Sequence, residues 1–131
     1  MKFLLDSGVW VWTIASPEKI SPRAFEVFND EKNEVYFSAV SSWELSIKAG
    51  NRKLQLPSPP DQCIPAFMAK QGLVPLAISH LHTVRVFDLP PYHRDPFDRL
   101  LIAQAMVEEM TILTNDQEFE KYPIDIVWCG K

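Results

Sequence analysis

Four acidic side chains follow apolar segments that lie far apart in the sequence. An ionised carboxylate is costly to bury without a partner, so an acid beside a core segment needs a reason. If these segments are neighbours in one sheet, the carboxylates converge and repel one another unless a cation lies between them. Hard divalent cations such as Mg²⁺ bind oxygen ligands of this kind, together with water and substrate phosphate. The pattern predicts a metal-dependent phosphoryl-transfer or nuclease site formed by Asp6, Glu44, Asp98 and Asp116.

The composition predicts one globular domain that spans residues 1–131. The net charge of −4 is unlike that of a general nucleic-acid coat protein, but it is compatible with a nuclease whose metal supplies local positive charge. The N-terminal apolar residues meet Asp6 almost at once, which argues against a signal peptide. Cys63 and Cys129 match neither a zinc pattern nor a disulfide framework, so a reducing cytoplasm is the expected location.

Strand and helix signals alternate along the chain, and the strand candidates are short and continuously apolar. This alternation predicts an α/β fold in which helices cover a parallel sheet. The expected strands are 2–5, 35–37, 74–78, 111–114 and 124–128. The expected helical segments are 22–29, 41–50, 61–72, 79–86, 97–109 and 117–121. Trp10 and Trp12 are expected mostly in the core or in an interface, and their alternation with valines suggests a face left for a partner surface.

The expected fold brings the four acids together. In parallel sheets, ligands bind beyond the carboxyl ends of the strands. Asp6 and Asp116 lie at such ends in the sequence, and Glu44 and Asp98 are expected in the first turns of helices. The convergence of the carboxylates therefore follows from the predicted fold.

Most of the acids also have a purely structural interpretation. Two pairs have the spacing of a capping box, Asp95 with Asp98 and Ser41 with Glu44. Asp6 is different, because it ends an apolar strand without a basic neighbour. The two interpretations are compatible, since the positive end of a helix dipole lowers the cost of holding a carboxylate beside others.

The segments that contain these acids resemble PIN-domain ribonucleases and, more narrowly, the VapC-type toxins of type II toxin–antitoxin pairs. The most specific segment is the run His93-Arg94-Asp95-Pro96-Phe97-Asp98-Arg99-Leu100-Leu101-Ile102-Ala103-Gln104-Ala105, and segments 2–7, 41–48 and 114–116 add to it. The resemblance implies a PIN-like three-layer α/β sandwich, with a central, mainly parallel sheet of four to five strands flanked by helices. It also implies an RNA-hydrolysing enzyme dependent on Mg²⁺ or Mn²⁺, commonly a homodimer. An antitoxin would cover the groove and place a basic side chain in the acidic pocket.

The resemblance assigns a role to each matching position. The four acids named above form the acidic quartet, with accessory groups at Ser7, Asp95, Thr114 and Asn115. Within the acidic quartet, Asp6, Asp98 and Asp116 are the expected metal ligands, and Glu44 is expected to orient or deprotonate water. The sequence leaves open whether one or two cations bind.

The basic residues that flank the acids in the most specific segment are Arg94 and Arg99. Arginine binds phosphate in bidentate fashion, so both are expected to contact RNA; for Arg99, an ion pair with a nearby acid is an equal alternative. His80, His82 and His93 show no metal-ligand spacing tied to the acids and are expected at the surface or in loops.

Many relatives of this subgroup have Thr-His after the first acid, where this chain has Ser7-Gly8. The loss of a ring at Gly8 keeps open a second function, a weakly or non-catalytic PIN-like module that binds RNA or protein. A phosphohydrolase or receiver-like domain is a further alternative. It is disfavoured because the chain has no lysine after a late strand in the receiver manner and no Gly-rich phosphate loop.

Overall fold

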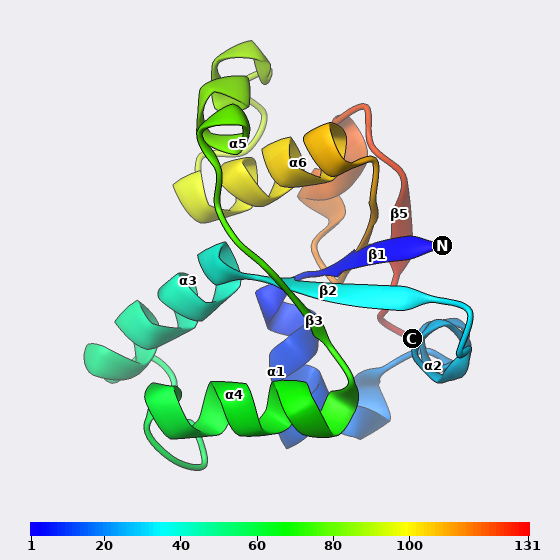
Figure 1. Cartoon of the computed structure of the whole chain (residues 1–131), viewed down its shortest axis with the longest axis vertical. Helices are drawn as coiled ribbons and strands as arrows, with labels where there is room; N and C mark the ends of the chain where they lie inside the picture. The colour runs from blue at the N-terminus through cyan, green and yellow to red at the C-terminus, as the bar shows by residue number, and fades with distance from the viewer.

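The computed structural model describes residues 1–131 and contains a five-stranded sheet in which every neighbouring pair of strands is parallel (Figure 1). Its spatial order is β3-β2-β1-β4-β5. The strands are β1 (Lys2–Leu5), β2 (Glu34–Ser38), β3 (Val74–Leu76), β4 (Thr111–Thr114) and β5 (Ile126–Trp128). The predicted parallel α/β sheet is therefore confirmed.

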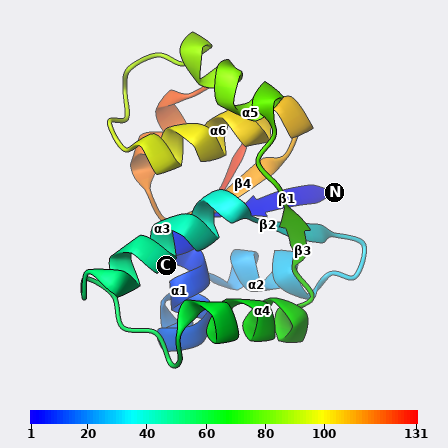
Figure 2. The ribbon, with the colours of Figure 1, turned by 60° about the vertical axis from the view of Figure 1, so that its left-hand side comes forward.

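Six α-helices and three short 3₁₀ helices connect the strands. The α-helices are α1 (Ser7–Ala15), α2 (Pro22–Asn29), α3 (Ala39–Gly50), α4 (Pro60–Gln71), α5 (His80–Arg85) and α6 (Pro96–Glu108). The 3₁₀ helices are η1 (Pro17–Lys19), η2 (Val86–Asp88) and η3 (Gln117–Lys121). Helices α5 and α6 cover one face of the sheet, and α1, α2 and α4 lie on the other side (Figure 2). None of the helices has the length and apolar character that a bilayer-spanning segment needs.

Successive side chains of the central strands point to opposite faces, and both faces are buried. Leu4 and Ile112 pack into the core beneath α6, whereas Phe3, Leu5 and Leu113 pack into the core beneath α1 and α4. Strands buried on both sides must be apolar at every position, which explains the continuous apolar runs in the sequence.

The helix starts follow local capping chemistry. The Ser21 side chain accepts a hydrogen bond from the Ala24 N–H at 3.2 Å, and Asp95 accepts one from the Phe97 N–H at 2.8 Å. In each case a proline follows the cap, as predicted.

Helix α3 begins earlier than the sequence predicted. Its cap is Ser38, whose Oγ accepts from the Val40 N–H at 3.0 Å, so β2 continues directly into the helix. The predicted capping box of Ser41 with Glu44 is therefore wrong. Glu44 lies beyond the first turn of α3, and its carboxylate is free to make contacts other than capping.

Helix α1 was not predicted. The expectation that Trp10 packs in the core is confirmed, and a partner surface at this residue is wrong. The Trp10 side chain is fully buried, with its ring centroid 5.4 Å from that of Phe37 and 6.3 Å from that of Phe67. Its indole N–H donates to Gln71 Oε1 at 3.0 Å. The alternation of tryptophan and valine comes from a helix with few polar positions, not from a strand with a free face.

The chain leaves the centre of the sheet in two directions. From β1 it passes to β2 and β3 on one side, and β4 and β5 extend the sheet on the other. The reversal of strand order therefore lies between the carboxyl ends of β1 and β4, the position at which parallel α/β sheets bind ligands.

Candidate metal centre

Asp6 follows β1 directly and lies beside the end of β4. The parallel register pairs Leu5 with Leu113, and the Asp6 N–H donates to the Leu113 carbonyl at 2.9 Å. Thr114 then donates its hydroxyl to Asp6 Oδ2 at 2.9 Å. The Asp6 side chain is buried and held at the edge of the sheet by these contacts.

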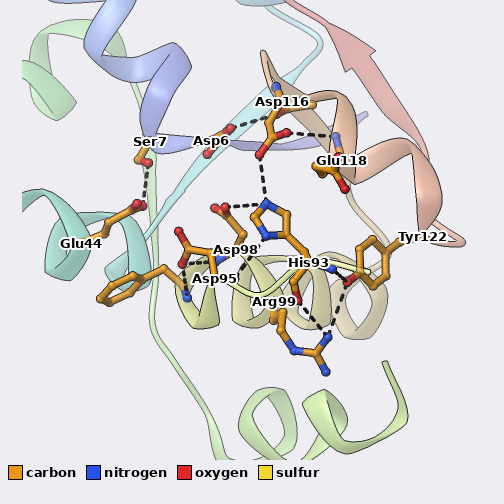
Figure 3. Close-up of polar contacts among 12 residues, drawn as sticks. Asp6, Ser7, Glu44, His93, Asp95, Asp98, Arg99, Asp116, Glu118 and Tyr122 are labelled. Atoms are coloured by element: carbon orange, nitrogen blue, oxygen red, sulfur yellow. Dashed lines mark hydrogen bonds and ion pairs between the residues drawn. The ribbon is translucent and has the colours of Figure 1, made fainter. Parts of the chain in front are cut away.

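Asp116 both caps a 3₁₀ helix and faces the cluster of acids. Its Oδ1 accepts from the Glu118 N–H at 2.9 Å and so caps η3, while its own N–H donates to Thr114 Oγ1 at 3.0 Å. Its Oδ2 points away from the cap, toward the other acids (Figure 3). Capping fixes one oxygen and leaves the other available.

Asp95 and Asp98 were predicted to form a capping box, but only Asp95 caps the helix. Asp95 Oδ1 caps α6 by accepting from the N–H groups of Phe97 and Asp98. The Asp98 carboxylate does not return a bond to the Asp95 N–H. It contacts His93 Nε2 instead, at 3.0 Å from its Oδ2. Asp98 therefore faces the cluster from the first turn of α6.

Glu44 reaches the same region from α3. Its Oε1 accepts from the Ser7 hydroxyl at 2.7 Å, and its Oε2 pairs with Lys48 Nζ at 2.8 Å. The structure thus brings together all four members of the acidic quartet, and places the accessory Ser7 and Thr114 in contact with two of them.

The contact of His93 with the acids was not predicted. Its Nε2 lies 3.0 Å from Oδ2 of Asp98 and 3.0 Å from Oδ2 of Asp116, in the middle of the cluster (Figure 3). The predicted surface or loop location is correct for His80, which is exposed, and for His93, which lies in the loop before α6. It is wrong for His82, which is buried and contacts Glu108 at 3.0 Å. The membership of His93 in the most specific sequence segment was the one signal that could have revealed it.

The electrostatics of the cluster favour protons or cations. Burial, followed by the charges of Asp6, Asp95, Glu44 and Asp116, raises the pKa of Asp98 to about 8. Burial likewise raises the pKa of Asp6 to about 6, although the Thr114 hydrogen bond opposes the shift. Charges on neighbouring carboxylates thus add to the effect of desolvation.

The donor set fits a hard divalent cation. Two groups each offer ligand atoms within 4.8 Å of one another, His93 with Asp98 and Asp116, and Glu44 with Asp95 and Asp98. Oxygen donors dominate both groups, and carboxylate oxygen is the ligand type of Mg²⁺ and Mn²⁺. Asp98 belongs to both groups, which makes it the central carboxylate.

The two arginines predicted to bind substrate have different surroundings. Arg94 is exposed. Arg99 donates from its guanidinium to the carbonyls of Val86, Leu89 and Pro90 at 3.4, 3.3 and 2.8 Å. These contacts hold the loop before α6. The alternative of an ion pair between Arg99 and a nearby acid is wrong, and its contact with RNA stays a prediction.

Gly8 lies at the start of α1, against Asn115. A Cβ at Gly8 would stand 2.9 Å from Asn115 Oδ1, closer than packed atoms approach. The Asn115 amide therefore occupies the space that a larger residue after the first acid would need. Ser7-Gly8 and Asn115 form a matched local arrangement.

A sequence model of the PIN domain matches residues 3–125. The chain belongs to the PIN domain family. Two curated relatives come from Mycobacterium tuberculosis. Ribonuclease VapC22 is 28% identical over 128 residues, which cover 91% of this chain and 90% of VapC22. Ribonuclease VapC16 is 35% identical over 57 residues, which cover 44% of this chain and only 40% of VapC16.

Solved structures share the PIN fold along almost the whole chain. The crystal structure of VapBC2 from Rickettsia felis, bound to a DNA fragment from its promoter, superposes with a TM-score of 0.73 at 18% identity. The match covers 97% of this PIN-domain chain and 98% of that chain. The three-layer arrangement of helices around a parallel sheet is thereby confirmed.

Proposed function

We propose that this PIN-domain protein, as a single domain over residues 1–131, is a metal-dependent endoribonuclease and the toxin of a toxin–antitoxin pair. The observation that carries the proposal is the convergence of the acidic quartet beyond the carboxyl ends of β1 and β4. Support comes also from the two relatives, both named ribonucleases. The reaction is the hydrolysis of RNA phosphodiester bonds, and the proposed location is the cytoplasm.

The residues of the site have separable tasks. A bound Mg²⁺ or Mn²⁺ polarises a phosphodiester and lowers the pKa of water. Asp6, Asp98 and Asp116 would hold the cation. Glu44 would orient the attacking water and accept its proton, because Ser7 and Lys48 fix its carboxylate in place.

Substrate contacts fall to groups at the rim of the acidic quartet. Arg94 is exposed and directly precedes Asp95, so its guanidinium is the proposed partner of an RNA phosphate. Asn115 and Asp95 complete the accessory positions. A contact of Arg99 with RNA stays a prediction, since its guanidinium donates to backbone carbonyls of the fold.

A non-catalytic binding module is the second candidate, and Gly8 is the observation that favours it. The close approach of Asn115 to Gly8 weakens this alternative, because the Asn115 side chain fills the space that a larger residue at position 8 would occupy. In addition, carboxylates that repel one another in the absence of a cation destabilise the fold, and a module that only binds RNA or protein does not explain why they converge.

Purified protein is expected to cleave single-stranded or loop RNA in the presence of Mg²⁺ or Mn²⁺ and to stop when EDTA is added. Gel analysis of a labelled RNA pool measures this directly. Asp6→Asn serves as the inactive control for contaminating nuclease. Cleavage that persists in EDTA, or that is equal in the control, contradicts the metal mechanism.

The proposed protein partner is a cognate antitoxin. Its support is the sequence resemblance to VapC-type toxins and the similarity in fold to a chain of a VapBC2 complex. A basic side chain of the antitoxin would enter the acidic quartet and replace the cation's charge. In the same RNA assay, a cognate antitoxin should therefore stop cleavage when it is added in equal amount.

A homodimer is the proposed assembly, and α5 with η2 is its proposed interface. Leu81, Val84 and Phe87 are 63%, 64% and 92% exposed, an apolar face that a monomer would leave in water. Arg85 and Asp88 lie beside it, 4.0 Å apart. A copy related by a twofold axis would meet this face with opposite charges at its rim.

Phe87→Glu is expected to convert the dimer to a monomer, because the charge would be buried without a partner. Size-exclusion chromatography with light scattering measures the mass. Phe25→Glu on α2, on the opposite side of the sheet from α5, is the matched control and should stay dimeric (Figure 1). A monomeric parent protein, or a dimeric Phe87→Glu variant, contradicts this interface.

A further inference from the structure

His93 has no assigned task in the reaction, although it lies between two acids of different elements. Asp98 comes from α6 and Asp116 follows β4, and His93 Nε2 is 3.0 Å from one carboxylate oxygen of each. The imidazole side chain is only 14% exposed. Both carboxylate oxygens are within hydrogen-bond distance of this one nitrogen.

The hydrogen bond to the other ring nitrogen fixes the tautomer. His93 Nδ1 accepts from the Asp95 N–H at 3.2 Å, so Nδ1 carries a lone pair. A neutral imidazole has a single N–H, which must then be on Nε2. This N–H is shared between Oδ2 of Asp98 and Oδ2 of Asp116.

Several contacts hold the ring in this orientation. The backbone N–H of His93 donates to the Tyr122 hydroxyl at 2.7 Å, and the Arg99 guanidinium donates to the backbone carbonyl of His93 at 3.4 Å. The ring centroid lies 5.9 Å from that of Phe119. Backbone and side chain are thus anchored independently of the two acids.

We propose that His93 is a positioning residue whose Nε2–H holds Asp98 and Asp116 together as joint ligands of one cation. The inference rests on the proposed metal site, and it assigns His93 as a donor and not as a ligand. Each carboxylate oxygen has two lone pairs, so it can accept the N–H and still face a cation. Ligation by Nε2 would require the proton to move to Nδ1, which would break the bond from the Asp95 N–H at the start of α6.

Two substitutions separate the donor from the space that the ring fills. Glutamine places an amide N–H near the position of Nε2, and leucine fills similar space without a donor. Outer partners of metal ligands commonly change affinity by 10- to 100-fold. His93→Leu is therefore expected to weaken Mn²⁺ binding by about 10- to 100-fold, and His93→Gln is expected to restore most of the loss.

Calorimetric titration with Mn²⁺ measures the affinity without RNA, and circular dichroism melts confirm that both variants are folded. Equal Mn²⁺ affinity in His93→Leu and the parent overturns the proposal. So does a folded His93→Gln variant that binds as weakly as His93→Leu. A parent protein that binds Mn²⁺ but leaves RNA intact contradicts the ribonuclease function and leaves the role of His93 standing.

The tautomer itself gives a readout that a merely structural role would not predict. Long-range ¹H–¹⁵N spectra of the histidine rings distinguish Nε2–H from Nδ1–H, and His93→Gln assigns the signals. The Nε2–H form is expected both without metal and at saturating Mg²⁺. A change to the Nδ1–H form on addition of Mg²⁺ would show ligation through Nε2 and overturn the proposal.

Discussion

Asp98→Asn is expected to raise the melting temperature of the metal-free protein while it abolishes RNA cleavage. The folded pKa of Asp98 is raised to about 8 from 3.8, mainly by burial and then by the charge of Asp6. Asparagine keeps an oxygen that accepts from His93 and removes the ionisable group. At pH 7 the free energy of unfolding is expected to rise by at most about 4 kcal/mol, because about 3 pKa units of the shift lie below pH 7 and each unit corresponds to about 1.4 kcal/mol.

A simple helix cap predicts the opposite sign. An acid in the first turn of a helix contributes about 0.3–1 kcal/mol through the dipole, so its loss would lower the melting temperature. Asp61, in the first turn of α4, is the matched control, since it is exposed and lies outside the acidic quartet. Asp61→Asn should melt slightly lower than the parent, and Asp98→Asn should melt higher, when both are measured in EDTA.

Asp98→Asn is also expected to lower the rate of RNA cleavage by a large factor. Loss of the central carboxylate removes several kcal/mol of transition-state stabilisation, which corresponds to about a 10³-fold lower rate or more. Asp98→Asn should also lose most of the rise in melting temperature that Mg²⁺ gives the parent, because binding to the native state stabilises it. A variant that melts lower in EDTA and keeps the full Mg²⁺ effect would show that Asp98 is a cap.

The strands were predictable because their burial leaves a simple trace in the sequence. Parallel strands covered on both faces must be apolar throughout, as Leu4, Leu5, Ile112 and Leu113 are. Helix α1 left no such trace. Trp10 packs inward and adjacent apolar residues surround it, so the segment lacks the polar face that identifies a surface helix.

The acidic quartet was predictable for a related reason. Carboxylates next to apolar strands are unusual, and the topology of a parallel sheet places strand ends side by side. The sequence could not reveal which acids also cap. That depends on where each helix begins, and Ser38 rather than Ser41 starts α3. Glu44 thus has its carboxylate bound by Ser7 and Lys48 instead of by the backbone.

The contacts of His93 and Arg99 could not be predicted from the spacing of residues in the sequence. The position of His93 depends on how the loop before α6 returns over the sheet, and that path is fixed by contacts with Tyr122, far along the chain. The Arg99 guanidinium donates to backbone carbonyls of the same loop, and these acceptors leave no signal in the sequence. Backbone acceptors are identical at every residue, so only the folded chain identifies a guanidinium that binds them.

Affinity for Mg²⁺ is expected to rise steeply with pH between about 6 and 8. The raised pKa values, about 8 for Asp98 and about 6 for Asp6, mean that the metal-free site holds protons across this range. A cation must displace them, so binding releases protons and the apparent Kd falls as pH rises. With one proton released, the fall is about tenfold per pH unit, and it flattens above pH 8.

The same pKa shifts give the metal-free protein the reverse dependence. A raised folded pKa contributes stability that is present below 3.8, where both states are protonated, and that is lost as pH rises through about 6 and about 8. The melting temperature in EDTA should therefore fall across the range in which Mg²⁺ binding strengthens. Calorimetric titration at several pH values, in buffers of different ionisation enthalpy, measures both the Kd and the protons released. A Kd that is constant from pH 6 to 8, with no proton release, would show that the carboxylates are already ionised before the cation binds.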